Sequence, residues 1–157
     1  MLLAACAVAA WLLLRGSEEH WIRQRLDLLA STLNGGPDQN GAAPFLKRLG
    51  VVKGLFAEDI VVSPSPPVPE IRGIDNLMGL LAEGLSGAGD MHVAFHDVTV
   101  TVDKGRRTAA MTATVTVTGA GEGSRQSIID AREFEVAWAK VDRKWRIRSV
   151  AEVQTLR

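Results

Sequence analysis

The sequence predicts an α+β fold in which a curved antiparallel sheet wraps around N-terminal helices and encloses a cone. Three observations support this prediction. Apolar residues recur at helical spacing in the first part of the chain, a proline-rich stretch at residues 63–69 then separates a β-branched run from one further helix, and from residue 91 onward the apolar period changes to two. Helices followed by consecutive strands are typical of α+β domains.

Composition limits the classes of function. The 157 residues are enough for one domain with a single core. Eighteen basic and eighteen acidic side chains give a formal charge of zero, so no net field attracts nucleic acid, and we expect none as a partner. The single cysteine, Cys6, excludes an internal disulfide and a thiolate-rich metal site. The sequence has no glycine-rich phosphate or dinucleotide motif, and we expect no cofactor and no metal.

Residues 1–14 are apolar throughout. As a helix they would cover about 21 Å, less than the roughly 30 Å hydrocarbon core of a bilayer. A cleaved signal peptide is disfavoured because no basic residue precedes the run, and a lipoprotein acylation site at Cys6 is disfavoured because apolar residues follow the cysteine. We interpret residues 1–16 as an uncleaved membrane anchor and residues 17–157 as one domain, with a buried N-terminal helix as the alternative.

Three helices are expected in the domain. Ser17 is a suitable N-terminal cap for the first, and the two glutamates that follow it suit the first turn of a helix. The Gly-Gly-Pro sequence at residues 35–37 ends this helix. Residues 43–55 form the second helix. The third helix starts within residues 72–77, and its broad apolar face consists of Leu77, Met78, Leu80, Leu81 and Leu85. The apolar stripe of the first helix consists of Ile22, Leu26, Leu29 and Leu33.

The strands are predicted from alternation. Residues 60–62 form a short strand, and the prolines that follow cannot donate hydrogen bonds to a ladder, so they run along an edge. Alternating apolar residues predict a hairpin of residues 92–102 and 108–117. A last hairpin needs an even-length turn, which places Arg146 and Arg148 on a solvated face. The apolar residues that share its buried face are Phe134, Val136, Trp138, Trp145 and Ile147.

This order of elements resembles the nuclear-transport-factor-2-like (NTF2-like), or SnoaL-like, superfamily, from residue 17 to the end. The segments that carry the resemblance are LFAEDIVV at 55–62, RGIDNL at 72–77, VDKGRRTA at 102–109 and KWRI at 144–147. The resemblance implies the cone-shaped NTF2-like (cystatin-like) fold. Members include ketosteroid isomerase, limonene epoxide hydrolase, scytalone dehydratase, polyketide cyclases and non-catalytic adaptors, some of them membrane-anchored, so the fold alone does not indicate an activity.

Four polar residues are the candidate catalytic group. Enzymes that resemble ketosteroid isomerase use a tyrosine, which this chain lacks, and the Arg-x-Asp order of the epoxide hydrolases is reversed here. Strand parity places Asp130 and Arg132 on the buried face of their strand, and His92 and His96 on the face of Val98, so all four would gather at the mouth of the cone. The alternative is a local ion pair at the sheet rim and two half-exposed histidines.

Two functions follow. The first is a membrane-anchored, non-catalytic domain for protein assembly or partner binding, because an apolar leader precedes a fold that lacks the superfamily's catalytic residues. The second is a small-molecule enzyme or carrier that uses the polar cluster and binds a small apolar ligand in the cone. The volume and polarity of the interior cavity discriminate between the two functions. A homodimer or a membrane protein complex is also expected, because Thr112, Thr114 and Thr116 form a face suited to twofold pairing.

The side of the membrane is set by conflicting signals. Arg15, Arg23 and Arg25 follow the apolar run and no basic residue precedes it, a pattern that places the domain in the cytoplasm. Anchored proteins of this shape commonly face the periplasm. We therefore expect the chain at the inner (cytoplasmic) membrane of a bacterium, with a single-pass anchor and the domain on the periplasmic side.

Overall fold

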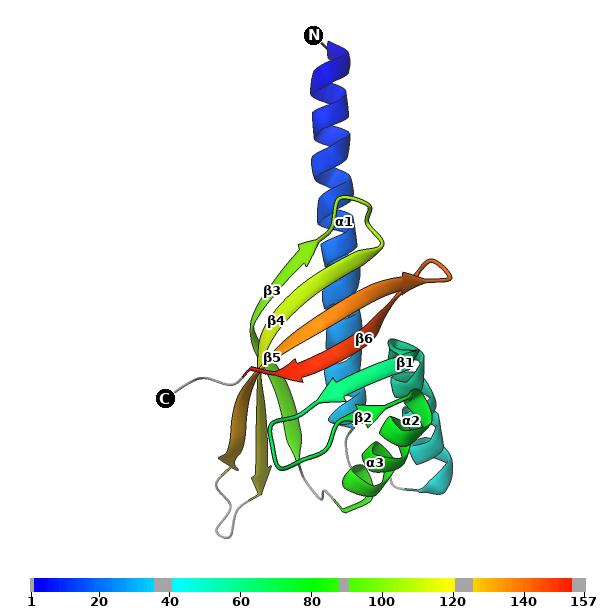
Figure 1. Ribbon diagram of the computed structural model, residues 1–157, viewed down its shortest axis with the longest axis vertical. Helices are drawn as coiled ribbons and strands as arrows, with labels where there is room; N and C mark the ends of the chain where they lie inside the picture. Colours follow the sequence, from blue (N-terminus) through cyan, green and yellow to red (C-terminus); the bar gives the residue numbers. More distant parts are fainter. Residues whose placement is uncertain (1, 36–40, 88–90, 121–125, 154–157) are drawn as a thin grey trace.

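The computed structural model describes residues 2–35, 41–87, 91–120 and 126–153. Within these ranges, three helices and six strands form one layer of helices against one curved sheet (Figure 1). The elements in chain order are α1 (Leu2–Leu33), α2 (Ala42–Leu55), β1 (Phe56–Ser63), β2 (Ile71–Arg72), α3 (Ile74–Gly87), β3 (His92–Val102), β4 (Thr108–Ala120), β5 (Gln126–Val141) and β6 (Lys144–Glu152).

The six strands lie in the order β2-β1-β6-β5-β4-β3. Strands β3, β4, β5 and β6 pair antiparallel with their neighbours in succession, and β2 pairs antiparallel with β1. The predicted α+β class and the wrapped sheet are confirmed, with one difference. Strand β1 runs parallel to β6, because the chain reaches β6 only after α3 and three further strands and not through a hairpin.

Helix α1 is one continuous helix from Leu2 to Leu33. The helix start predicted at Ser17 is therefore wrong. The residues before it are themselves good helix formers, and the Gly16-Ser17 step costs only about 1 kcal/mol in a helix interior, too little to break it. The second half of α1 crosses the sheet, whereas its first half continues beyond the edge of the sheet (Figure 1).

The core lies between α1 and the inner face of the sheet. The predicted stripe on α1 is confirmed, since Ile22, Leu26 and Leu29 are buried and Leu33 packs against them. On the sheet side, the two-residue turn of the last hairpin pairs Val141 with Lys144, so the even register was predicted correctly. The largest side chains of the core that are less than 2% exposed are Trp138, Ile22, Leu55, Ile60 and Val52.

Polar side chains of α1 and of the residue that follows it bind the edge strand β3. The Asn34 side chain accepts a hydrogen bond from the Val93 amide at 2.6 Å and donates one to the Val93 carbonyl at 2.7 Å. This pair of bonds replaces the two that a neighbouring strand would make. The Arg23 guanidinium donates to the Val98 carbonyl at 3.0 Å. These bonds fix the helix against one side of the sheet and occupy edge groups that would otherwise be unpaired.

No helix within residues 2–35, 41–87, 91–120 and 126–153 is long and apolar enough to cross a membrane. The anchor predicted at residues 1–16 is thus not supported, and the division into 1–16 and 17–157 stays a prediction.

Candidate functional site

The two candidate histidines lie on the outer face of the sheet. Residues Asp97 and Val98 of β3 together oppose a single residue of β4, and Asp97 has a φ of 51°, so the strand carries a bulge there. The bulge reverses the alternation, and His96 consequently pairs with Thr114 and donates or accepts a hydrogen bond with Thr116 at 3.0 Å. The parity argument that placed the histidines on the face of Val98 is wrong for this reason.

The candidate carboxylate and guanidinium lie on the inner face, at the opposite side of the sheet from the histidines. Arg132 pairs with Val115, and two residues further along, Phe134 pairs with Ala113, which is buried. Residues directly opposite each other on neighbouring strands share a face. Asp130 and Arg132 therefore belong to the inner face, and the four candidates do not form one cluster. Whether any of them is catalytic stays a prediction.

Asp130 and Arg132 form the local ion pair that was the alternative interpretation. The Arg132 Nε donates to Asp130 at 2.7 Å, and its Nη1 donates to Glu152 of β6 at 2.8 Å. Glu152 in turn accepts the amide of Ser65, in the proline-rich segment, at 2.9 Å. This backbone bond and the Arg132 cation lower the pKa of Glu152, and Asp130 and Glu152 raise the pKa of Arg132. The chain of contacts holds the proline-rich segment at the sheet edge.

Described residues form an open cleft next to these groups and another one between α2, α3 and the β1–β6 pair. A cleft of about 560 Å³ lies between the proline-rich segment and the end of β5, and Arg132 and Glu152 line it. The Arg132 side chain is 48% exposed and already bonded to two carboxylates, so its charge is largely neutralised there. This cleft can accommodate a neutral group more readily than an anion.

The second cleft has a volume of about 880 Å³ and lies between α2, α3 and the β1–β6 pair. Lys53, Glu58, Asp75 and Arg146 are its charged lining residues, and Lys53 bonds Asp75 at 3.2 Å. Arg146, predicted on a solvated face, is half-buried, and its Nε has no partner among the described residues. The Arg146 guanidinium is therefore a cationic donor in this cleft that forms no ion pair with a carboxylate of the described residues.

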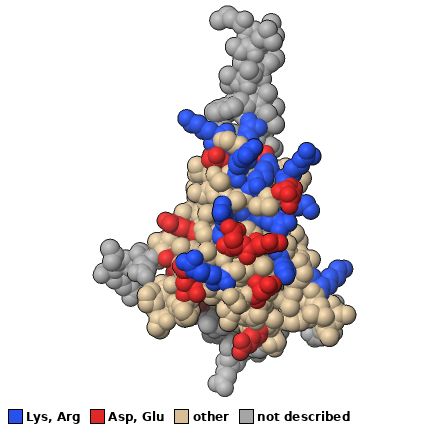
Figure 2. All heavy atoms as spheres, turned by 45° about the vertical axis from the view of Figure 1, so that its right-hand side comes forward, with Lys and Arg blue, Asp and Glu red and all other residues tan. Residues whose placement is uncertain are grey.

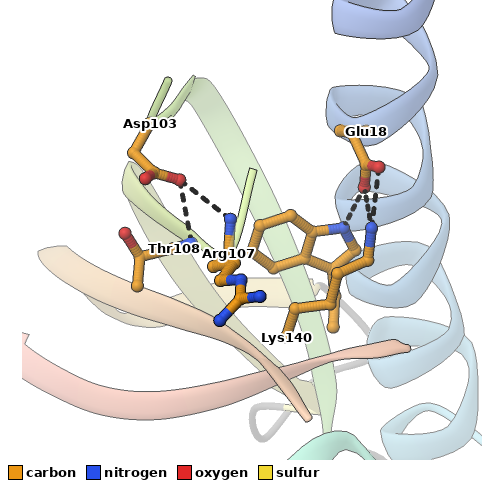
Figure 3. A network of polar contacts seen from close by, with 6 residues as sticks. Glu18, Asp103, Arg107, Thr108 and Lys140 are labelled. Atoms are coloured by element: carbon orange, nitrogen blue, oxygen red, sulfur yellow. Dashed lines mark hydrogen bonds and ion pairs between the residues drawn. The ribbon is translucent and has the colours of Figure 1, made fainter. Parts of the chain in front are cut away.

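A partly buried polar cluster fixes α1 where the helix leaves the sheet (Figure 3). Glu18 is only 14% exposed and accepts hydrogen bonds from the Lys140 ammonium at 2.7 and 2.9 Å and from the Trp145 indole at 2.6 Å. The ammonium also lies 5.4 Å from the centre of the Trp145 ring. Burial acts to raise the pKa of Glu18, but the bonds from Lys140 and Trp145 outweigh it, and the pKa is lowered.

Sequence reasoning missed Glu18 as a contact residue and assigned it to the first turn of a helix. A signal was present, because Lys140 is a charged residue that alternation places on the same face as the buried Trp138. A cation at a position that alternation assigns to the core requires a carboxylate from another element. The sequence did not indicate which acidic residue of α1 would supply it.

Comparison with protein families matches residues 46–151 to the SnoaL-like domain. No curated protein matches the chain in a sequence search. Among solved structures, an NTF2-like protein with a cystatin-like fold from Novosphingobium aromaticivorans is 15% identical, with a TM-score of 0.71 over 92% of this chain and 86% of that one.

Two further structures from the same organism are similar in fold. A proposed scytalone dehydratase is 17% identical, with a TM-score of 0.68 over 89% of this chain and 85% of that one. A proposed aromatic ring hydroxylase is 15% identical, with a TM-score of 0.68 over 90% of this chain and 91% of that one. At these identities the likeness concerns the fold alone. Because the family match covers most of the sequence, the chain belongs to the SnoaL-like domain family.

Proposed function

We propose that the chain is a membrane-attached SnoaL-like domain that acts by binding a partner and not by catalysis. The observation that carries the proposal is the continuity of α1. A single helix includes the apolar residues 2–14 and the core residues Ile22, Leu26 and Leu29. The Glu18 cluster fixes the helix to the sheet between these two parts. An apolar segment that binds a bilayer would thus hold the domain in one orientation.

The placement of the candidate catalytic residues supports the binding role. Asp130 and Arg132 bond each other and Glu152, and the histidines lie on the other face of the sheet. A general acid and base must both reach one substrate, within about 3 Å of the atoms that exchange the proton or through one water. These four groups are divided between two faces, so they cannot serve one reaction centre together.

If residues 2–14 attach the chain to a membrane, placing charged side chains in this segment should release it. Replacing both Val8 and Leu12 with lysine is expected to remove the chain from the sedimented membrane fraction, since each lysine opposes insertion by about 2.5–3.5 kcal/mol. The matched control replaces Leu28 and Leu46 with lysine, because both are exposed on the domain. Release of the control, or retention of the Val8/Leu12 variant, would contradict the proposal.

The partner-binding half of the proposal has its own test. Chemical cross-linking of the full chain in detergent extract should give a stoichiometric complex with a second copy or with another membrane protein. A chain that sediments only as a monomer and captures nothing stoichiometric would show that the domain is not an assembly module. The side of the membrane, which we propose to be the periplasm, is measured by protease accessibility in spheroplasts.

A second candidate function is binding of a small molecule in the 880 Å³ cleft. The half-buried Arg146 whose Nε has no partner among the described residues favours it. A bound molecule should appear in native mass spectrometry of the full chain and should be absent from Gly54→Leu, because Gly54 lines the cleft and has open space around it. Gly79→Leu, equally unobstructed but outside the cleft, is the control. An adduct that Gly54→Leu retains would exclude this site.

A further inference from the structure

The turns of two hairpins bring cationic side chains to the side of the sheet from which α1 projects. The turn between β3 and β4 follows Val102, and the turn between β5 and β6 follows Val141. The two lie side by side, because the Lys140 amide donates to the Arg107 carbonyl at 2.8 Å. Lys140, just before the second turn, also bonds Glu18 of α1 (Figure 3), so the ends of both hairpins lie on the side of the sheet where the helix leaves it (Figure 1).

Five cations of these turns form what we call the basic collar. Figure 2 shows Lys and Arg side chains gathered on this part of the surface, next to the projecting helix. None of the five forms an ion pair with another side chain of the described residues. The basic collar consists of Lys104, Arg106, Arg107, Arg143 and Lys144, and all except the half-buried Arg106 are exposed.

Two of the three acidic groups next to the collar already form hydrogen bonds within the fold. Asp103 accepts the amides of Gly105, Arg107 and Thr108, which lowers its pKa and fixes the turn (Figure 3). Glu18 is bonded to Lys140. Asp142 is the remaining carboxylate of the two turns. The chain as a whole is neutral, so the collar makes one end of the molecule positive and leaves the rest negative.

We propose that the basic collar binds the anionic headgroups of phospholipids while the N-terminal part of α1 enters the bilayer. The proposal rests on the membrane attachment proposed above and adds the class of lipid and the contact residues. A short apolar segment alone gives weak and reversible attachment, and a second, electrostatic signal makes it stable. Lysines and arginines at a membrane surface each contribute about 1 kcal/mol towards binding of anionic lipid, or about five-fold in affinity.

The test compares vesicles of phosphatidylcholine with vesicles that also contain phosphatidylglycerol. The full chain is synthesised in a cell-free reaction with the vesicles, and the bound fraction is measured by flotation over a range of lipid concentrations. Wild type should prefer the anionic vesicles on the order of 1,000-fold, and salt should reduce this preference because it screens surface charge. The variant Lys104→Gln/Arg107→Gln/Arg143→Gln/Lys144→Gln should lose the preference and bind both vesicles as wild type binds phosphatidylcholine.

A variant of equal charge serves as the control. Lys47→Gln/Lys53→Gln/Arg72→Gln/Arg148→Gln also removes four exposed cations, away from the two turns, and should keep the preference. Equal loss in both variants, or retained preference in the collar variant, would overturn the inference. Displacement of wild type from the anionic vesicles by a DNA duplex at an equal phosphate concentration would also overturn it. If wild type floats with neither vesicle, the membrane attachment itself is wrong, which is a separate result.

Discussion

Replacement of Trp138 with alanine is expected to lower the free energy of unfolding by about 3–5 kcal/mol. The side chain is 1% exposed and lies at the centre of the sheet, between Ala109 of β4 and Ile147 of β6. Both neighbours are buried, so the structure around a truncated side chain cannot collapse without moving three strands. Urea denaturation followed by circular dichroism, which does not depend on tryptophan fluorescence, measures the loss.

Trp138→Phe is the matched control for this prediction. The indole Nε1 of Trp138 has no hydrogen-bond acceptor among the described residues. Phenylalanine removes that donor and keeps most of the apolar volume, so the relief of an unpaired polar group offsets part of the lost packing. We expect Trp138→Phe to cost less than about 1.5 kcal/mol. Equal losses for the two variants would mean that the indole nitrogen has a partner and that the packing argument is incomplete.

Removal of the Glu18 carboxylate is expected to give the second largest effect. Glu18→Ala should lower the free energy of unfolding by about 2–3 kcal/mol, because it leaves two donors, the Lys140 ammonium and the Trp145 indole, without their acceptor. The Lys140 side chain is 27% exposed and cannot regain full hydration. Glu19→Ala is the control, since its ion pair with Arg23 is exposed and worth about 0.5 kcal/mol.

The same carboxylate predicts a pH dependence. The pKa of Glu18 is lower in the folded protein than the ordinary value of 4.5, so folding favours the charged form. The resulting stability is fully present above the unfolded pKa and is lost as the pH falls below 4.5 through the folded pKa. Urea midpoints measured across this range should fall more steeply for wild type than for Glu18→Gln. Parallel pH profiles for the two proteins would contradict the assignment of this carboxylate.

Much of the architecture could be predicted because apolar spacing is a local property. The stripe of Ile22, Leu26 and Leu29 and the even register of the last hairpin depend only on residues close in sequence. The parallel pairing of β1 with β6 could not be predicted from local spacing, since no local pattern indicates which distant strand lies alongside β1. The exposed Leu46 of α2 shows that a leucine at helical spacing need not reach the core.

The candidate site was less predictable for a specific reason. One αL residue, Asp97, inserts a bulge in β3, and every residue before it changes face, which moves His92 and His96 away from Asp130 and Arg132. Aspartate tolerates this conformation better than most residues. The sequence does carry a sign of the bulge, because the apolar residues change from odd positions (Val93 and Phe95) to even positions (Val98 and onward). Parity arguments in long strands fail whenever such a residue occurs.

The central claim is that the N-terminal part of α1 enters a bilayer while the rest of the helix remains on the sheet. Trp11 tests it directly, since it is the only tryptophan in residues 1–14. The full chain is bound to vesicles that contain bromine-labelled acyl chains, which quench nearby tryptophans, and compared with the Trp11→Phe variant. The account predicts that wild type is quenched and that the variant loses this quenched component. Equal fluorescence of wild type in labelled and unlabelled vesicles to which it has bound would contradict it.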